Sequence, residues 1–178
     1  MRALIFEPQF VGHNLVYVRH MIQALLPLGV EVTLLTSCQA TDSEEYQRHL
    51  GVLKGSYEVI TSDLFSESSQ SGGVRVNGLA GLFSSMRTIL DGLKSTRPDQ
   101  FYVPFGNPLA HALGVPNPVS RYLRKERIEA EIVLLFGKYA YKHRGLASKA
   151  KEQLALQLLA NGPWVKVHHI VPYAIDVM

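Results

Sequence analysis

Residues 2–36 read RALIFEPQFVGHNLVYVRHMIQALLPLGVEVTLLT, and they contain the order strand, turn, helix, strand. The apolar run at residues 3–6 predicts a buried strand, and residues 30–36, which are rich in β-branched side chains, predict a second one. Between them, apolar residues recur at every third or fourth position, which predicts an amphipathic helix. Gly29 is typical of the C-terminal end of such a helix. The predicted buried face of this helix consists of Leu15, Val18, Ile22 and Leu25.

The same alternation continues along the rest of the chain. Further strands are predicted at residues 57–61, 100–104, 130–136 and 165–171, and helices at residues 41–55, from 78, from 108, from 118 and at 147–160. Alternating strands and helices favour parallel strands joined by right-handed helical crossovers. We therefore expect an α/β, Rossmann-like, three-layer α/β/α fold with a mainly parallel sheet of about six strands. Residues 1–178 are expected to form a single domain.

Composition excludes several classes of protein. A net charge of +3 over 178 residues is too weak to indicate nucleic-acid binding, so no nucleic-acid partner is expected. Cys38 is the sole cysteine, which rules out an internal disulfide and fits a reducing compartment. No apolar run approaches the roughly 18 residues that a membrane-spanning helix requires, and no signal peptide is recognisable. We expect a cytoplasmic protein.

Ligands of open parallel sheets bind at the carboxyl ends of the strands, near the point where the strand order reverses. Four candidate binding residues follow the first predicted strand. Gly12 allows a close backbone approach, and Asn14 is expected to cap the next helix, whose free N–H groups suit an anion. His13 can move a proton or donate to a hydroxyl, and Glu7 offers a carboxylate. The alternative is that Gly12 only makes the turn and His13 is a solvated loop residue.

Two further candidate segments follow later strands. Asn107 comes after the fourth predicted strand and is expected to cap a helix that Pro108 opens. The sequence GKYAYKHRG at residues 137–145 follows the fifth strand. Lys138 and Arg144 could bind a phosphate there while Tyr139 stacks on a sugar or base. The alternative is a solvated basic loop whose tyrosines close the core.

Basic residues also share one face of the helix predicted from residue 118. Arg121, Arg124 and Lys125 lie at helical spacing there, a pattern that usually marks a solvated surface. The second interpretation is contact with acidic lipid headgroups, which attract basic surfaces. On that interpretation the protein lies peripherally at the inner face of the membrane.

Several site motifs are absent from the sequence. There is no Gly-x-Gly-x-x-Gly fingerprint, no Walker A motif and no Gly-x-Ser-x-Gly nucleophile elbow. No His, Cys, Asp or Glu cluster has the spacing of a metal site, so no metal is expected.

The opening of the chain resembles that of a GT-B fold glycosyltransferase of the group-1 type. Those enzymes begin with a strand, a glycine-containing loop and a long helix that ends in Leu-x-x-x-Gly before a second strand. In this chain Leu25 and Gly29 are the leucine and the glycine of that pattern. RPDQFYVPFGNPLAHALG, at residues 97–114, resembles the later Pro-Asp, strand, loop and helix of the family. IVPYAID, at residues 170–176, is similar to the hinge that leads into the family's second domain.

The resemblance implies that the chain is the N-terminal, acceptor-side half of a two-domain enzyme. The family's donor-binding pair of glutamates is missing from this sequence, so a C-terminal donor-binding domain is an expected partner and the chain alone is expected to be inactive. The full enzyme would move a sugar from a nucleotide-activated donor, which is a substrate and not a cofactor, to a hydroxyl of a sugar or glycolipid acceptor. No cofactor or metal is implied.

The resemblance also assigns roles to the candidate residues. Many members of the family have a histidine after the fourth strand, where this chain has Pro104, Phe105 and Gly106. That role is therefore either unfilled or taken by His13, which is the catalytic candidate. The family usually has paired glycines in the first loop, where this chain has one. The substrate-binding candidates are Glu7, Gly12, Asn14, Asn107, Lys138, Tyr139 and Arg144.

Two other classes of function fit the same residues. One is a different enzyme on the same fold, similar to half of an epimerase or to a nucleotide hydrolase. The other is a non-catalytic Rossmann-like module that binds a partner through its basic loops.

Overall fold

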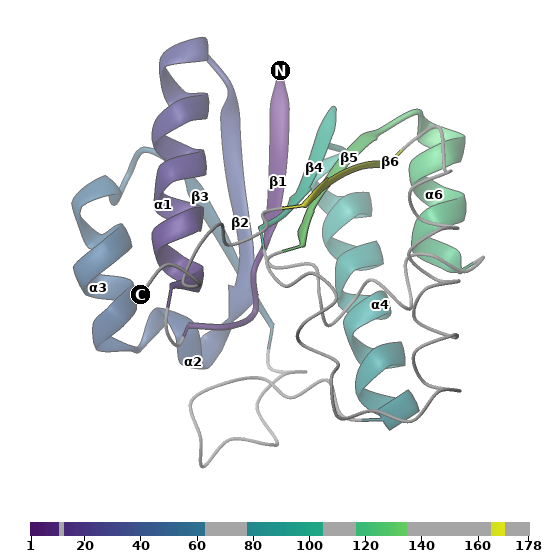
Figure 1. The fold of residues 1–178 in the computed structure, drawn as a ribbon, viewed down its shortest axis with the longest axis horizontal. Coiled ribbons are helices and arrows are strands. Elements are labelled where there is room, and N and C mark those ends of the chain that lie inside the picture. Colours follow the sequence, from purple (N-terminus) through teal and green to yellow (C-terminus); the bar gives the residue numbers. More distant parts are fainter. Residues whose placement is uncertain (11–12, 63–77, 105–116, 135–164, 170–178) are drawn as a thin grey trace, which may run out of the picture.

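The computed structural model describes residues 1–10, 13–62, 78–104, 117–134 and 165–169 (Figure 1). Its core is a six-stranded sheet with the order β3-β2-β1-β4-β5-β6, in which every neighbouring pair is parallel. The prediction of a mainly parallel Rossmann-like sheet is confirmed. The strands are β1 (Arg2–Phe6), β2 (Glu31–Ser37), β3 (Glu58–Ser62), β4 (Gln100–Val103), β5 (Glu129–Leu134) and β6 (Val165–His169).

Helices cover both faces of this sheet (Figure 1). α1 packs with α3 on one face, and α4 packs with α6 on the other, as the two separate apolar cores show. The described helices are α1 (Asn14–Leu25), α2 (Cys38–Thr41), α3 (Glu44–Leu50), α4 (Gly78–Thr96) and α6 (Pro118–Glu126), with short 3-10 turns η1 (Leu26–Leu28) and η2 (Gly51–Leu53).

β1 lies at the centre of the sheet and is buried on both faces. Successive side chains of a strand point to opposite faces. Leu4 and Phe6 accordingly join the core beneath α4, and Ala3 and Ile5 join the core beneath α1. A strand that is covered on both faces has a continuous apolar sequence, which is why residues 3–6 could be predicted as a buried strand.

α1 buries the predicted face but starts differently from the prediction. Leu15, Val18 and Ile22 are fully buried, and the chain leaves the helix through Gly29, whose φ of 70° favours glycine. The expectation that Asn14 caps α1 is wrong. His13 is the N-cap residue, and Asn14 is the first residue of the helix, because the Asn14 amide is hydrogen-bonded to a loop side chain.

α4 packs very closely against the sheet. A Cβ placed on Gly92 would lie 2.7 Å from Leu35 Cδ2, so the missing side chain is what allows this approach. The spacing of apolar residues after residue 78 predicts a buried stripe that includes Phe83, Ile89 and Leu93. Ile89 and Leu93 are buried, but the prediction for Phe83 is wrong, because its side chain is 71% exposed.

The continuous helix expected over residues 41–55 is also wrong. The chain forms α2, α3 and η2 instead, because Ser37 and Ser43 each start a helix by accepting a backbone N–H with the side-chain oxygen. The sequence predicts a cap at Asp42 or Ser43, and the structure confirms Ser43. Asn117 caps α6 and shares a capping box with Ser120. The helix predicted at residues 147–160 lies outside the described residues.

The first prediction tests the α1 core. Ile22→Ala should lower the free energy of unfolding by about 2–5 kcal/mol, because it leaves a cavity beneath a fully buried side chain. Gln23→Ala, an exposed neighbour on the same helix, is the matched control and should change stability by about 0.5 kcal/mol or less. Urea unfolding of both variants measures the difference. Equal stabilities would mean that the packing of α1 is misassigned.

Candidate functional site

The strand order places a topological switch point between β1 and β4. From β1 the chain runs outward to β2 and β3, then crosses to β4 on the other side of β1 and runs outward to β5 and β6. α1, which follows β1, lies on one face of the sheet, whereas α6, which follows β4, lies on the other. In folds of this type, ligands bind at the carboxyl ends of the two strands whose connections diverge in this way.

Glu7 is the first residue beyond β1 at this edge. Its backbone continues the pairing with β2, because its N–H donates to the Leu35 carbonyl at 3.1 Å and its carbonyl accepts the Thr36 hydroxyl at 2.7 Å. The Ser37 hydroxyl donates to the carbonyl of Pro8 at 3.1 Å. The end of β2 therefore fixes the start of the loop that leads to α1.

The carboxyl group of Glu7 is buried and only half satisfied. Glu7 is 1% exposed, on the α1 face that Ala3 and Ile5 also occupy by alternation. The Gln9 N–H donates to Glu7 Oε1 at 3.0 Å, whereas Glu7 Oε2 has no hydrogen-bond partner among the described residues. Burial raises the pKa of Glu7 to about 8, against the lowering effect of the Gln9 hydrogen bond. The neutral acid therefore predominates at pH 7.

Gln9 joins this carboxyl group to the start of α1. Its side-chain Oε1 accepts a hydrogen bond from Asn14 Nδ2 at 3.1 Å, and Asn14 is itself buried. Glu7, Gln9 and Asn14 thus form one hydrogen-bonded network. Sequence reasoning missed Gln9, because a glutamine in a loop carries no motif. The burial of Glu7 could have been anticipated by extending the alternation of β1 one step further.

His13 lies at the exposed N-terminal end of α1. Its carbonyl accepts the N–H groups of Val16 and Tyr17, but its side chain makes no capping hydrogen bond. An α-helix leaves its first N–H groups without partners inside the helix, and the helix dipole makes this end partially positive. The terminus therefore suits oxygen atoms of a ligand.

Arg19 is a further polar residue of α1 with an unsatisfied atom. Its Nε is buried and has no hydrogen-bond partner in the part of the chain that the structure describes. Long side chains on a helix lean toward its N-terminus, which directs the stem of Arg19 toward the first turn of α1. Arg19 was not among the candidates from the sequence.

The structure thus brings together part of the predicted site. Glu7 and Asn14 are connected through Gln9, and His13 adjoins Asn14 in sequence at the same helix end. The remaining candidates lie outside the described residues: Gly12, Asn107, Lys138, Tyr139 and Arg144. Among the residues that are described, no group of His, Cys, Asp or Glu side chains could hold a metal ion.

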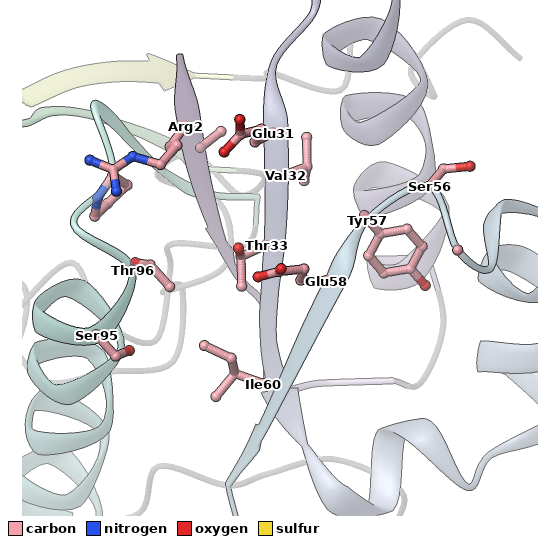
Figure 2. Close-up of a pocket in the computed structure, with 13 residues that line it drawn as sticks. Arg2, Glu31, Val32, Thr33, Ser56, Tyr57, Glu58, Ile60, Ser95 and Thr96 are labelled. Atoms are coloured by element: carbon pink, nitrogen blue, oxygen red, sulfur yellow. The ribbon is translucent and has the colours of Figure 1, made fainter.

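A hollow of about 510 Å³ lies at the opposite, amino-terminal edge of the sheet (Figure 2). Glu31 and Thr33 of β2 and Glu58 of β3 line it, together with Ser95 and Thr96 at the end of α4. Volume alone would favour this hollow over the carboxyl edge. We place the candidate site at the carboxyl edge, because the switch point, the half-satisfied buried acid and the uncapped helix terminus all occur there.

A smaller hollow of about 370 Å³ lies between α3 and β3, and it too is distant from the switch point in the strand order.

No helix in the described ranges is both long and apolar enough to cross a membrane.

No family model and no curated protein matches the sequence. Solved structures do match. MurG from Acinetobacter baumannii is 12% identical and aligns with a TM-score of 0.52 over 96% of this chain and 42% of MurG. UDP-GlcNAc 2-epimerase from Neisseria meningitidis, in a structure bound to UDP-GlcNAc, is 14% identical with a TM-score of 0.50, over 89% of this chain and 39% of the epimerase.

Both neighbours have GT-B-type folds, so the α/β Rossmann-like fold of this chain is that of a GT-B-type domain. The chain spans less than half the length of either neighbour.

The second prediction concerns Glu7 and pH. Because the pKa of Glu7 is higher in the folded protein than its usual value of 4.5, the folded state keeps a proton that the unfolded chain loses. This contribution to stability is complete below pH 4.5 and is lost as the pH rises toward 8. Between pH 5 and pH 8 the free energy of unfolding should fall by about 2–4 kcal/mol more in the wild type than in Glu7→Gln.

Urea unfolding of both proteins at pH 5, 6, 7 and 8 measures this difference in slope. The glutamine variant is the matched control, since its amide has the shape of the protonated acid but does not titrate. Parallel pH profiles for the two proteins would show that Glu7 is ionised in the folded state at neutral pH.

Proposed function

We propose that this chain is the acceptor-binding half of a glycosyltransferase that moves a sugar from a nucleotide-activated donor to an acceptor hydroxyl. The observation that carries the proposal is the network of Glu7, Gln9 and Asn14 beside the uncapped start of α1. It offers neutral hydrogen-bonding groups at the switch point between β1 and β4, where a sugar hydroxyl can be held.

The fold supports this choice of reaction. MurG is a glycosyltransferase, and this chain aligns over nearly its whole length with less than half of MurG. We propose that the other part of the enzyme is a second, donor-binding domain, so that the sugar crosses between two domains. The nucleotide-activated sugar is then a substrate and no cofactor is needed.

In the proposed reaction the acceptor oxygen attacks the anomeric carbon of the donor sugar. The bond from that carbon to the donor phosphate breaks, and the nucleoside diphosphate leaves with the bonding electron pair. His13 is the proposed base that takes the acceptor proton, because it is exposed at the helix end beside the network. Gly12, Asn107, Lys138, Tyr139 and Arg144 remain proposed substrate-binding residues.

The second candidate is half of an epimerase. The alignment with UDP-GlcNAc 2-epimerase favours it at the level of the fold. The two candidates differ in what the carboxyl edge of this domain should bind: a neutral acceptor in a glycosyltransferase, and the sugar nucleotide itself in an epimerase. Binding by the isolated chain therefore separates them. A non-catalytic module would bind neither.

We also propose that α6 contacts an acidic membrane surface, where a glycolipid acceptor would be found. Arg121, Arg124 and Lys125 are exposed on this helix, as the sequence predicted, and Arg127 follows its end. Lys125 pairs with Glu126, which leaves the two arginines as the stronger candidates. Basic residues near an anionic surface contribute about 1 kcal/mol each.

The third prediction tests the acceptor role by NMR. Methyl glycosides of several hexoses, added to ¹⁵N-labelled residues 1–178, should shift the amides of Gln9, His13 and Asn14, with weak affinity in the range of about 1 mM. UDP-GlcNAc should shift these amides less, and the chain should not turn it over, because the proposed donor domain is missing.

Amides at the amino-edge hollow, such as Glu31 and Glu58, are the internal control and should not move. Tight binding or conversion of UDP-GlcNAc by this chain alone would contradict the half-enzyme proposal and favour the epimerase class.

The fourth prediction tests α6. Vesicles that contain phosphatidylglycerol should sediment the wild type, and vesicles of phosphatidylcholine alone should not. Arg121→Gln with Arg124→Gln should weaken binding by about 2 kcal/mol, a factor of roughly 30. Arg48→Gln with Lys54→Gln removes the same charge from an exposed region near α3 and is the matched control. Equal losses in both double variants would mean that only net charge matters.

A further inference from the structure

We infer that the missing hydrogen-bond partner of Glu7 Oε2 is a hydroxyl group of an uncharged, sugar-like ligand. This inference rests on the proposed function and deepens it, because it names the chemical class that the site recognises and the atom that recognises it. It would make Glu7 the residue that determines the ligand specificity of the site.

The first step is the state of the carboxyl group. Buried polar atoms in folded proteins nearly always have a hydrogen-bond partner. Glu7 Oε1 has one in the Gln9 N–H, whereas Oε2 is buried and has none within the described ranges. Leaving such an atom unsatisfied destabilises the folded protein. An unsatisfied buried oxygen at the carboxyl end of the central strand, with no partner in the described part of the chain, points to a partner that a ligand supplies.

The second step is the choice of partner. A hydroxyl group both donates and accepts, so it can donate to an ionised carboxylate or accept from a protonated one. An ammonium group only donates and fits the ionised form alone. An ionised phosphate oxygen only accepts, and the negative charge of inorganic phosphate is repelled by an ionised carboxylate, so phosphate fits the protonated form alone. Because the pKa of Glu7 is about 8, both forms are populated between pH 7 and pH 9, and a hydroxyl is the group that suits both.

The neighbouring groups match the same ligand class. Gln9 and Asn14 contribute amides without charge, and the first turn of α1 contributes N–H groups. A sugar ring carries several hydroxyls in close succession. It could therefore meet Glu7 with one hydroxyl and the Asn14 amide or the helix terminus with the next.

The third step is access to Oε2, which is sealed from solvent. The chain is tied to β2 up to Pro8, through the Thr36 and Ser37 hydroxyls. Within the described residues, Gln9 is the first loop residue with no such bond to β2, and its side-chain oxygen accepts the hydrogen bond from Asn14 Nδ2. A ligand that displaces the Gln9 side chain would free Asn14 Nδ2 as a donor, and we propose that the same displacement opens the path to Oε2.

The test compares three probe classes on ¹⁵N-labelled residues 1–178 at pH 7.5. The probes are methyl glycosides of glucose, mannose, galactose and N-acetylglucosamine, then inorganic phosphate, then methylammonium chloride. At least one glycoside should shift the amides of Gln9, Asn14 and Leu15 with an affinity at least tenfold higher than that of the two ions. Phosphate or methylammonium binding there as tightly as the best glycoside would overturn the inference.

Variants of Glu7 supply the second readout. Glu7→Gln keeps a donor and an acceptor and should bind the best glycoside within about threefold of the wild type. Glu7→Leu keeps the volume but makes no hydrogen bond, and it should bind at least about tenfold more weakly. Glu58→Gln, at the amino-edge hollow, is the control and should bind like the wild type. Thermal melts establish that each variant is folded.

Different results would contradict the role of Glu7 and the acceptor-binding proposal. A glycoside that shifts this edge equally in the wild type and in a folded Glu7→Leu overturns the role of Glu7 but leaves the acceptor-binding proposal intact. If none of the glycosides shifts any amide at the carboxyl edge, both are overturned. Should Glu7→Leu fail to fold, the comparison of the three probe classes on the wild type still decides the inference.

Discussion

The parallel pairing of β1 with both β2 and β4 is the constraint on which the rest of the structure depends. It places the carboxyl ends of three strands at one edge, while the connections after β1 and β4 lead to opposite faces. A strand in this position must be apolar on both faces, and Leu4, Ile5 and Phe6 are completely buried. The close approach of α4 at Gly92 then fixes the second face against β2.

The burial of Glu7 follows from the same constraint and works against stability. The alternation that puts Ile5 beneath α1 also puts Glu7 there, because Glu7 follows two residues later in the chain. An apolar residue at this position would avoid the unsatisfied oxygen and the dependence of stability on proton binding. A costly polar group kept at the switch point of an open sheet is the kind of local conflict that marks functional positions. The neutral network that surrounds it distinguishes this edge from the charged hollow at the other end of the sheet.

Much of the fold followed from the sequence, and the reasons are local. Each strand is a short apolar or β-branched run between turn residues, and Ser43 and Asn117 cap their helices through their own side chains. The failures arose where a tertiary contact decided the outcome. Asn14 looked like a cap, but its side-chain amide is bound to Gln9, and the N-cap position falls to His13, whose side chain makes no capping hydrogen bond. Of the candidate site, Glu7, His13 and Asn14 were recognisable as polar residues after a strand, whereas the role of Gln9 depends on a contact within the loop that no periodicity encodes.

The central claim is that a buried, protonated Glu7 lies at the carboxyl end of β1 and forms a hydrogen bond with a ligand there. A ¹³C NMR titration of the side-chain carboxyl of Glu7 tests it most directly, with Glu58 as an exposed reference in the same sample. The account predicts that the pKa of Glu7 is about 8, since burial is its main cause. A carboxyl resonance that titrates near the usual value of 4.5 would show that Glu7 is solvated or ion-paired, and would remove the basis for a ligand site at this atom.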